Sequence, residues 1–310
     1  MFDHFAWSVV ATPLLVLLGT WLSADRLRPD LAPRVFAWSA VVAALASTVN
    51  LVVFGLKALA QIPAVAAVGD WSADVVVADT AHVPWVPGLS LVWACAVAIA
   101  VGAQWWRRRR VLRAARAEVE WLEPRGDVVT VADERVEAFA LPGTRGRPGR
   151  IVLTTGILDI LDERQRVAVI AHERAHLAGD HHTLVWLTRV AATAHPVLWP
   201  VARKVAYLVE RAADEAAAVE LGDRRHVARA IGFAALAAAR SGGVARSHGL
   251  PAALGAAPGV VPRRVSALMV PRERRRWTAV LPVLLAIGTV VWTFECVYDL
   301  HELLALASIR

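Results

Sequence analysis

The chain has 310 residues, of which 57% are hydrophobic, and its mean hydropathy of +0.48 is positive. This composition is more apolar than that of an average soluble chain, so it favours an integral membrane protein. The formal net charge of +7 could indicate a nucleic-acid-binding protein. However, the arginines concentrate beside apolar stretches, where membrane topology and anionic lipid already account for them. We therefore expect the lipid bilayer as a partner, with no direct nucleic-acid binding.

Four stretches have no charged side chain and are each about long enough to cross a hydrocarbon core. They comprise residues 5–22, 35–56, 89–106 and 277–294. We expect the first to be a permanent helix, because no basic residue precedes it and no clear small-residue cleavage site follows it. The sequence therefore predicts four transmembrane helices.

Arginines between and beside these stretches predict the orientation. They lie between the first two spans, directly after the third at 107–110, and directly before the fourth at 272 and 274–276. Short loops rich in arginine remain cytoplasmic. The predicted protein is thus a multi-pass cell-membrane protein with both termini outside. The segment between the third and fourth spans would then be cytoplasmic.

Three parts follow along the chain: three transmembrane helices in 1–106, a cytoplasmic domain in 107–276, and a fourth transmembrane helix with a short outer tail in 277–310. The middle part opens with a predicted basic helix over 107–123, and then with short strands at 128–131, 136–141 and 151–155. Asp162 and Gln165 form a predicted capping box for a helix that ends at Gly179. The expected fold class is an α-helical membrane protein with a cytoplasmic α+β domain.

Residues 172–176 of that helix read HERAH, the HExxH pattern. Histidines four residues apart lie on one helix face, so His172 and His176 can both reach one metal ion, and Glu173 projects beside them as a candidate general base. Neutral imidazoles suit zinc, and a catalytic zinc site needs three protein ligands and a water. A five-residue pattern also arises by chance in helices, which would leave two ordinary histidines and a glutamate.

A second helical segment, ERAADEAA, begins at Glu210. Glu210 can supply the third metal ligand. Asp214 lies on the same face one turn later and can accept a hydrogen bond from the outer ring nitrogen of a ligating histidine. Alternatively, both acids belong to a solvated helix face with Glu215 and Glu220. The position of Glu210 and Asp214 after HExxH favours the metal site.

These motifs together resemble the BlaR/MecR-type membrane metallopeptidases and, more distantly, the HtpX and CAAX prenyl proteases. The shared features, in order, are three spans, EAFALPG from 137, IVLTTGILDIL from 151, HERAH, HPVLWP from 195, ERAADEAA and a last span. The resemblance implies a gluzincin site with one Zn²⁺ per chain, bound by His172, His176 and Glu210, and a regulatory protein as substrate. A winged-helix repressor, or the chain itself, is the expected target.

The chain departs from that family in one respect. The β-lactam sensors carry a large extracellular penicillin-binding domain after their last span, whereas only residues 295–310 follow it here. The resemblance therefore supports proteolysis better than antibiotic sensing.

Zinc-assisted peptide hydrolysis requires a base, a substrate-binding surface and an oxyanion stabiliser. We assign the base to Glu173. By resemblance, substrate backbone pairs with the strand around Ala138, Phe139 and Ala140. His226 is a candidate oxyanion stabiliser, although a solvent-facing histidine is the simpler interpretation.

Other features are interpreted as structural. A helix start or polar turn is expected at Asp180, His181 and His182. A structural turn is expected at His195. The apolar stretch 184–202 is expected not to cross the bilayer, because a crossing would separate Glu210 from HExxH. Residues 240–262 are typical of a loop. Cys95 and Cys296 are expected to be packing residues.

Two alternative functions compete with regulatory proteolysis. One is a quality-control protease similar to HtpX, which would degrade damaged membrane proteins. The other is a non-catalytic transmembrane signalling scaffold, which would have no physical need to keep the base, the ligands and the neighbouring acid together.

Overall fold

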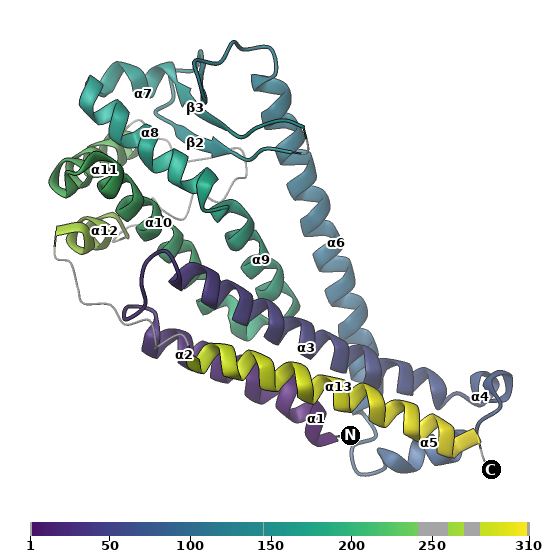
Figure 1. Cartoon of the computed structure of the whole chain (residues 1–310). Helices are drawn as coiled ribbons and strands as arrows, with labels where there is room; N and C mark the ends of the chain where they lie inside the picture. The colour runs from purple at the N-terminus through teal and green to yellow at the C-terminus, as the bar shows by residue number, and fades with distance from the viewer. Residues whose placement is uncertain (1, 145, 241–259, 270–279, 309–310) are drawn as a thin grey trace.

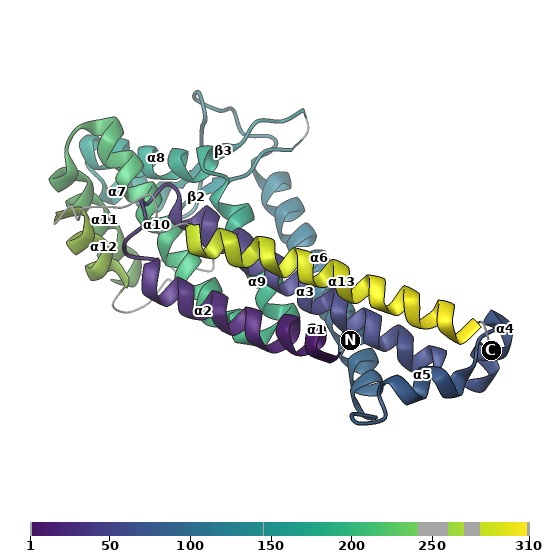
Figure 2. The ribbon, with the colours of Figure 1, turned by 60° about the horizontal axis from the view of Figure 1, so that its bottom comes forward.

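The computed structural model describes residues 2–144, 146–240, 260–269 and 280–308. It consists of a long apolar helical bundle and a mixed α/β head at one end (Figures 1 and 2). The helices and strands of the bundle and head are, in chain order, α1 (Phe2–Ala6), η1 (Trp7–Ala11), α2 (Thr12–Ser23), α3 (Ala32–Ala60), α4 (Pro63–Gly69), α5 (Ala73–Asp79), α6 (Val86–Val119), β1 (Val128–Val131), β2 (Ala138–Leu141), β3 (Arg150–Thr154), α7 (Thr155–Ile160), α8 (Glu163–Ala178), α9 (His181–Ala194), η2 (Pro196–Leu198), α10 (Trp199–Leu221), α11 (Arg224–Arg240), α12 (Val260–Met269) and α13 (Val280–Ser308).

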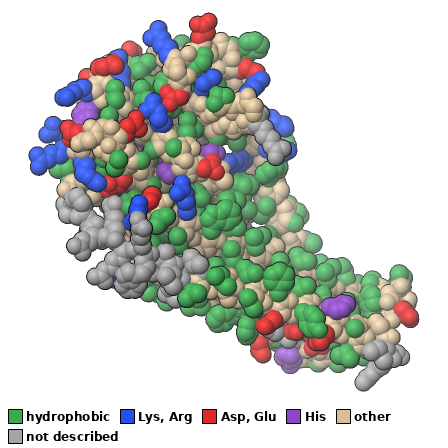
Figure 3. All heavy atoms as spheres, viewed as in Figure 1, with side chains coloured by type: hydrophobic (Ala, Val, Ile, Leu, Met, Phe, Trp, Pro, Cys, Tyr) green, Lys and Arg blue, Asp and Glu red, His purple; other side chains and the backbone are tan. Residues whose placement is uncertain are grey.

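In the bundle, α2, α3 and α13 lie side by side (Figures 1 and 2). Among the described residues, two helices are long and apolar enough to cross a membrane, namely α3 and α6, and residues Trp7–Ser23 form a shorter apolar helix. Figure 3 shows hydrophobic side chains over most of the visible bundle surface, whereas lysine and arginine side chains gather on the head, and acidic side chains lie on the head and at the far end of the bundle. Exposed bundle residues include Leu14, Leu18, Trp38 and Leu45. This surface distribution weakly suggests a membrane protein; four transmembrane helices stay a prediction.

Helix α6 joins the predicted third span and the predicted basic helix into one helix of 34 residues. At 1.5 Å per residue it is about 51 Å long. It runs from the bundle to the sheet of the head (Figure 1). Its last turns pack on the sheet through Leu112, Ala115 and Val119, which contact Phe139 and the neighbouring core.

The apolar stretch 184–202 forms a helical hairpin, α9 and the start of α10, joined by the turn η2. Both helices pack against α3 in one apolar core that includes Phe36, Ala40, Val185 and Val201. The tip of the hairpin is fixed by His195, whose Nε2–H donates to the Val9 carbonyl at 2.8 Å. The hairpin therefore returns α10 to the same end as α8, as expected from the requirement that Glu210 reach HExxH.

The sheet has the order β1-β3-β2, with β1 parallel and β2 antiparallel to β3. All three predicted strands are confirmed to within two residues at each end. Strand β2 is an edge strand of this sheet, because only its β3 side is paired within the described sheet.

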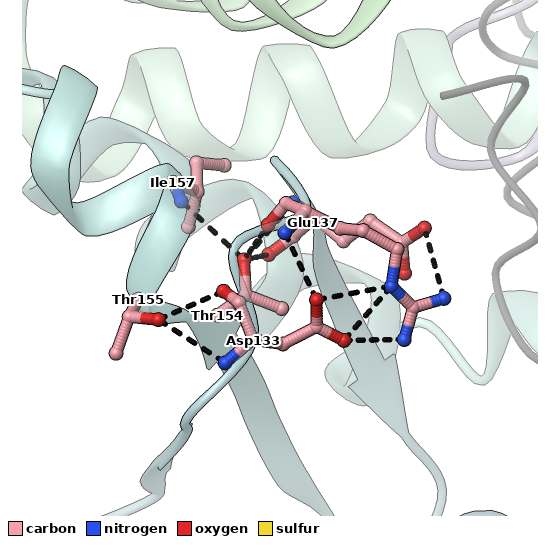
Figure 4. Close-up of polar contacts among 6 residues, drawn as sticks. Asp133, Glu137, Thr154, Thr155 and Ile157 are labelled. Atoms are coloured by element: carbon pink, nitrogen blue, oxygen red, sulfur yellow. Dashed lines mark hydrogen bonds and ion pairs between the residues drawn. The ribbon is translucent and has the colours of Figure 1, made fainter. Parts of the chain in front are cut away.

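A polar network fixes the position of β2 (Figure 4). The buried Thr154 hydroxyl accepts hydrogen bonds from the backbone N–H groups of Glu137 and Ile157 and contacts the carbonyls of Arg135 and Glu137. Nearby, Gly156 approaches the backbone so closely that an added Cβ would lie 2.1 Å from the Glu134 carbonyl oxygen. Glycine is therefore required where the chain leading into β2 crosses the end of β3.

Helix α8 begins with the predicted capping box. Asp162 Oδ1 accepts from the Gln165 N–H at 2.8 Å, and Gln165 Oε1 accepts from the Asp162 N–H at 3.1 Å. Its C-cap is Gly179, also as predicted.

Three expectations agree with the structure only in part. The predicted outer tail 295–310 is helical through Ser308, because Leu300, Leu303 and Leu304 pack onto the bundle. The predicted loop 240–262 overlaps the end of α11 and the start of α12, and its residues 241–259 lie outside the described part, as do the arginines at 272 and 274–276. Cys296 is buried, as expected of a packing residue, whereas Cys95 is exposed, and both are free thiols.

Candidate active site

The predicted ligands His172, His176 and Glu210 converge between α8 and α10. The two Nε2 atoms lie 3.1 Å apart, and they lie 3.7 Å and 3.6 Å from the Glu210 carboxylate oxygens. One ligand atom from each residue falls within 4.8 Å of the others. Glu210 is brought there because α10 packs directly against α8.

This donor set fits a zinc ion. Tetrahedral ligands about 2.0 to 2.1 Å from zinc are separated from one another by about 3.3 Å. The three separations here, 3.1, 3.6 and 3.7 Å, bracket that value. Two histidines and one carboxylate also match the ligand types of a catalytic zinc site, which keeps a fourth position open.

The outer ring nitrogen of each histidine faces a second residue. His172 Nδ1 lies 3.0 Å from Asp214 Oδ1, the partner expected from the sequence. His176 Nδ1 lies 3.2 Å from Nδ1 of His181. Groups in these positions fix the tautomer and orientation of a ligating imidazole. His181 is thus not one of the three clustered ligands but a neighbour of one, a role that the sequence interpretation missed.

The tight turn between α8 and α9 explains how His181 reaches His176. Gly179 ends α8, and Asp180 adopts a left-handed conformation with φ of 51°. A Cβ at Gly179 would lie 2.3 Å from His181 Nε2. The glycine therefore allows the first residue of α9 to fold back on the last turn of α8, a signal present in the GDHH sequence.

Arg264 of α12 is the other residue that the sequence interpretation missed. Its side chain is 7% exposed, and its guanidinium forms a bidentate pair with Asp214, with Nη2 and Nε at 2.6 and 2.8 Å from the two carboxylate oxygens. Its Nη1 lies 2.8 Å from Glu210 Oε2. Arg264 therefore holds the third ligand and the acid behind His172 in one buried network.

These neighbours shift the pKa values of the cluster. Burial lowers the pKa of His176 to about 3, so this ring is neutral, the form that coordinates metal. For His172 the effect of burial is outweighed by Asp214 and Glu210, which raise its pKa to about 10. The pKa values of Glu210 and Asp214 are lowered, since burial, which raises them, is outweighed mainly by Arg264. Both acids are carboxylates near neutral pH.

Glu173 lines a cavity of about 220 Å³ together with the clustered ligands, residues 136–140 and Arg264. Burial raises the pKa of its carboxyl to about 7, an effect that His172 partly offsets, and its carboxylate accepts a hydrogen bond from the Ala140 backbone. A carboxyl with a pKa near the working pH both takes and returns a proton efficiently. The geometry is that of a general base beside a metal site.

Ala138, Phe139 and Ala140 of β2 line the same cavity, and β2 is the last strand in the order β1-β3-β2. His226 is not brought to the cavity. It lies in the first turn of α11, where its Nε2–H donates to the Arg164 carbonyl at 2.9 Å and its backbone N–H donates to Asp223. Among the described residues lining the cavity, Arg264 is the one arginine or lysine.

Comparisons with known proteins agree with this geometry. The family model of peptidase family M48 matches residues 103–252, which include HExxH, Glu210 and Asp214. No curated protein and no solved structure matches the chain. The matched segment, which holds the clustered His172, His176 and Glu210, is therefore similar to the M48 peptidases, which are zinc-dependent metallopeptidases.

Proposed function

We propose that the chain is an integral-membrane zinc endopeptidase that hydrolyses a regulatory protein on the cytoplasmic side. The observation that carries the peptidase assignment is the convergence of His172, His176 and Glu210 beside the buried Glu173. The apolar bundle surface and the arginines beside the apolar stretches support the membrane location and orientation. The ordered motifs shared with BlaR/MecR-type proteins support a regulatory substrate, such as a winged-helix repressor.

Each group has a separate task in hydrolysis. His172, His176 and Glu210 would hold the zinc ion, which would supply Lewis-acid activation of a water and of the scissile carbonyl. Glu173 accepts the proton of the attacking water and returns it to the leaving amine. Strand β2, whose residues Ala138, Phe139 and Ala140 line the cavity, pairs with the substrate backbone in an extended conformation, which places a peptide bond over the cluster. Arg264 keeps Glu210 and Asp214 ionised and positioned.

The test compares the purified, detergent-solubilised parent with Glu173→Gln and Glu210→Gln. Zinc content and cleavage of casein and of a candidate repressor are measured. We expect Glu173→Gln to keep zinc and lose about 10² to 10⁴-fold in cleavage rate. Glu210→Gln should lose both zinc and cleavage. The matched control is Glu163→Gln, on the same helix with an 82% exposed side chain, which should change neither.

The outcomes separate the competing functions. Discrete repressor fragments with slow casein cleavage support regulation, whereas broad casein degradation without repressor cleavage indicates quality control. A parent that binds no zinc, or undiminished cleavage by Glu173→Gln, would overturn the peptidase assignment in favour of a non-catalytic scaffold.

A further inference from the structure

A second cavity, of about 610 Å³, lies between α6 and α9. Its lining includes Arg107, Arg108 and Arg110 of α6, and His182, Trp186 and Arg189 of α9. Arg108 lies over the Trp186 ring with its guanidinium carbon 4.5 Å from the centroid, and its Nη1 donates to the His182 carbonyl at 3.5 Å. The cavity is therefore a built, aromatic-walled site with four guanidinium groups around it.

The described residues that line this cavity supply no negative charge to match the guanidinium groups. The described lining holds no aspartate or glutamate. Asp180, outside the lining, contacts His182 at 3.2 Å and interacts with Arg108. The guanidinium of Arg189 forms no hydrogen bond or ion pair with another described residue, and burial alone lowers its pKa. Arg108 and Arg189 are partly buried, and burial lowers the pKa of both, so an anion in this cavity would offset the cost of desolvating them.

The lining also offers an unused hydrogen-bond donor. The Nε1–H of Trp186 is buried and has no hydrogen-bond partner in the described part of the chain. Buried indole N–H groups usually find an acceptor. Together with the arginines, this donor indicates a ligand that carries several oxygen acceptors.

The position of the cavity indicates the source of such a ligand. Residues 107–110 directly follow the uncharged stretch 89–106, and Trp105 and Trp106 are exposed just before them. Tryptophan and arginine belts lie at the level of lipid headgroups. With the proposed membrane location, the cavity opens where the cytoplasmic leaflet presents phosphates.

We propose that this cavity binds the phosphate group of an anionic phospholipid. Arginine presents a planar fork of donors that matches phosphate oxygens bidentately. A zwitterionic headgroup would bring its own ammonium group among the four guanidinium groups, so a net-negative headgroup is preferred. His182 lines both this cavity and the catalytic cavity, so the bound headgroup touches a wall that the two sites share.

The test titrates the full chain in neutral detergent with dihexanoyl-phosphatidylglycerol, dihexanoyl-phosphatidylcholine and inorganic phosphate, using isothermal calorimetry. We expect phosphatidylglycerol to bind saturably, and we expect no saturable binding of phosphatidylcholine or inorganic phosphate. Arg189→Gln should weaken it about tenfold or more, as does the loss of one charge-assisted contact. Arg113→Gln, an exposed α6 arginine outside the cavity lining, is the matched control and should bind as the parent does.

Two further variants keep the test decisive. Arg107→Gln repeats the measurement at an exposed lining position if Arg189→Gln does not fold, and Arg189→Lys should restore part of the affinity. Equal binding of phosphatidylcholine would overturn the anionic preference, and equally tight inorganic phosphate would overturn the lipid source. Unchanged binding by the lining variants would overturn the site. Zinc content, measured in parallel, keeps this result separate from the peptidase assignment.

Discussion

Arginines occupy two contrasting regions of this molecule. In the catalytic cavity, Arg264 is almost fully buried and contacts both Asp214 and Glu210 within 2.8 Å. In the cavity between α6 and α9, Arg189 has no ion-pair partner among the described residues. Arg264 therefore balances two buried carboxylates, whereas the positive charge of Arg189 is not balanced by any described residue. The contribution of an arginine to folding stability depends on the charges that it contacts. Removal of Arg264 should therefore destabilise the fold, whereas removal of Arg189 should not.

The largest expected effect is at Arg264. Arg264→Met removes the cation from two buried carboxylates and leaves them uncompensated. Breaking a buried charge network in this way costs about 3 to 5 kcal/mol in the free energy of unfolding. Denaturant unfolding in detergent, followed by circular dichroism, measures this loss.

The neighbouring Arg263 supplies the control for that measurement. It is exposed and lies 5.2 Å from the Tyr207 ring centroid, so Arg263→Met should cost less than about 1 kcal/mol. Equal destabilisation by both substitutions would show that the Arg264 network does not stabilise the fold, and the contrast between the two regions would fail.

A smaller effect is expected at Asp214, which sharpens the comparison by removing one acid and keeping the cation. Asp214→Asn leaves an amide oxygen that can still face His172 Nδ1 but lacks the negative charge that orients the ring. Loss of such a partner lowers metal affinity about 10 to 100-fold. Competition with a fluorescent zinc chelator measures the affinity.

Glu220→Gln, which removes an exposed charge from the same helix, is the control for Asp214→Asn. Its zinc affinity should equal that of the parent. If Asp214→Asn also bound zinc with parental affinity, Asp214 would be only a structural partner of Arg264.

Local signals in the sequence predicted the parts of the fold that depend on neighbouring residues. The capping box of Asp162 and Gln165 fixed the start of α8, and the spacing of HExxH put His172 and His176 on one face. The helical pattern ERAADEAA indicated Glu210 as a ligand. If Glu210 is to reach HExxH, α9 and α10 must form a hairpin that returns the chain to the end of the molecule that holds α8. These positions could be inferred because helix periodicity converts sequence spacing directly into position.

The partners of the cluster could not be predicted in the same way. Arg264 lies 50 residues beyond Asp214 and 92 beyond His172, and no local spacing connects it to either. His181 depends on a turn that folds α9 back on α8. His226 was the candidate for the oxyanion because it follows the third-ligand helix, yet the N-terminal turn of α11 directs it to Arg164. Contacts between distant segments depend on tertiary packing, which a single sequence does not encode by spacing.

The smallest expected effect is at Arg189, and it tests whether this arginine, unlike Arg264, contributes little to the stability of the fold. Arg189→Met removes a partly buried cation that has no carboxylate partner among the described residues. Without acidic lipid, the free energy of unfolding should change by less than about 1 kcal/mol, or increase slightly. With phosphatidylglycerol present, a ligand bound only to the folded state stabilises it, so the parent should gain stability that Arg189→Met lacks. Thermal unfolding with and without the lipid measures both quantities. A loss of several kcal/mol without lipid would show that Arg189 stabilises the fold, as Arg264 is expected to, and the distinction between the two regions would disappear.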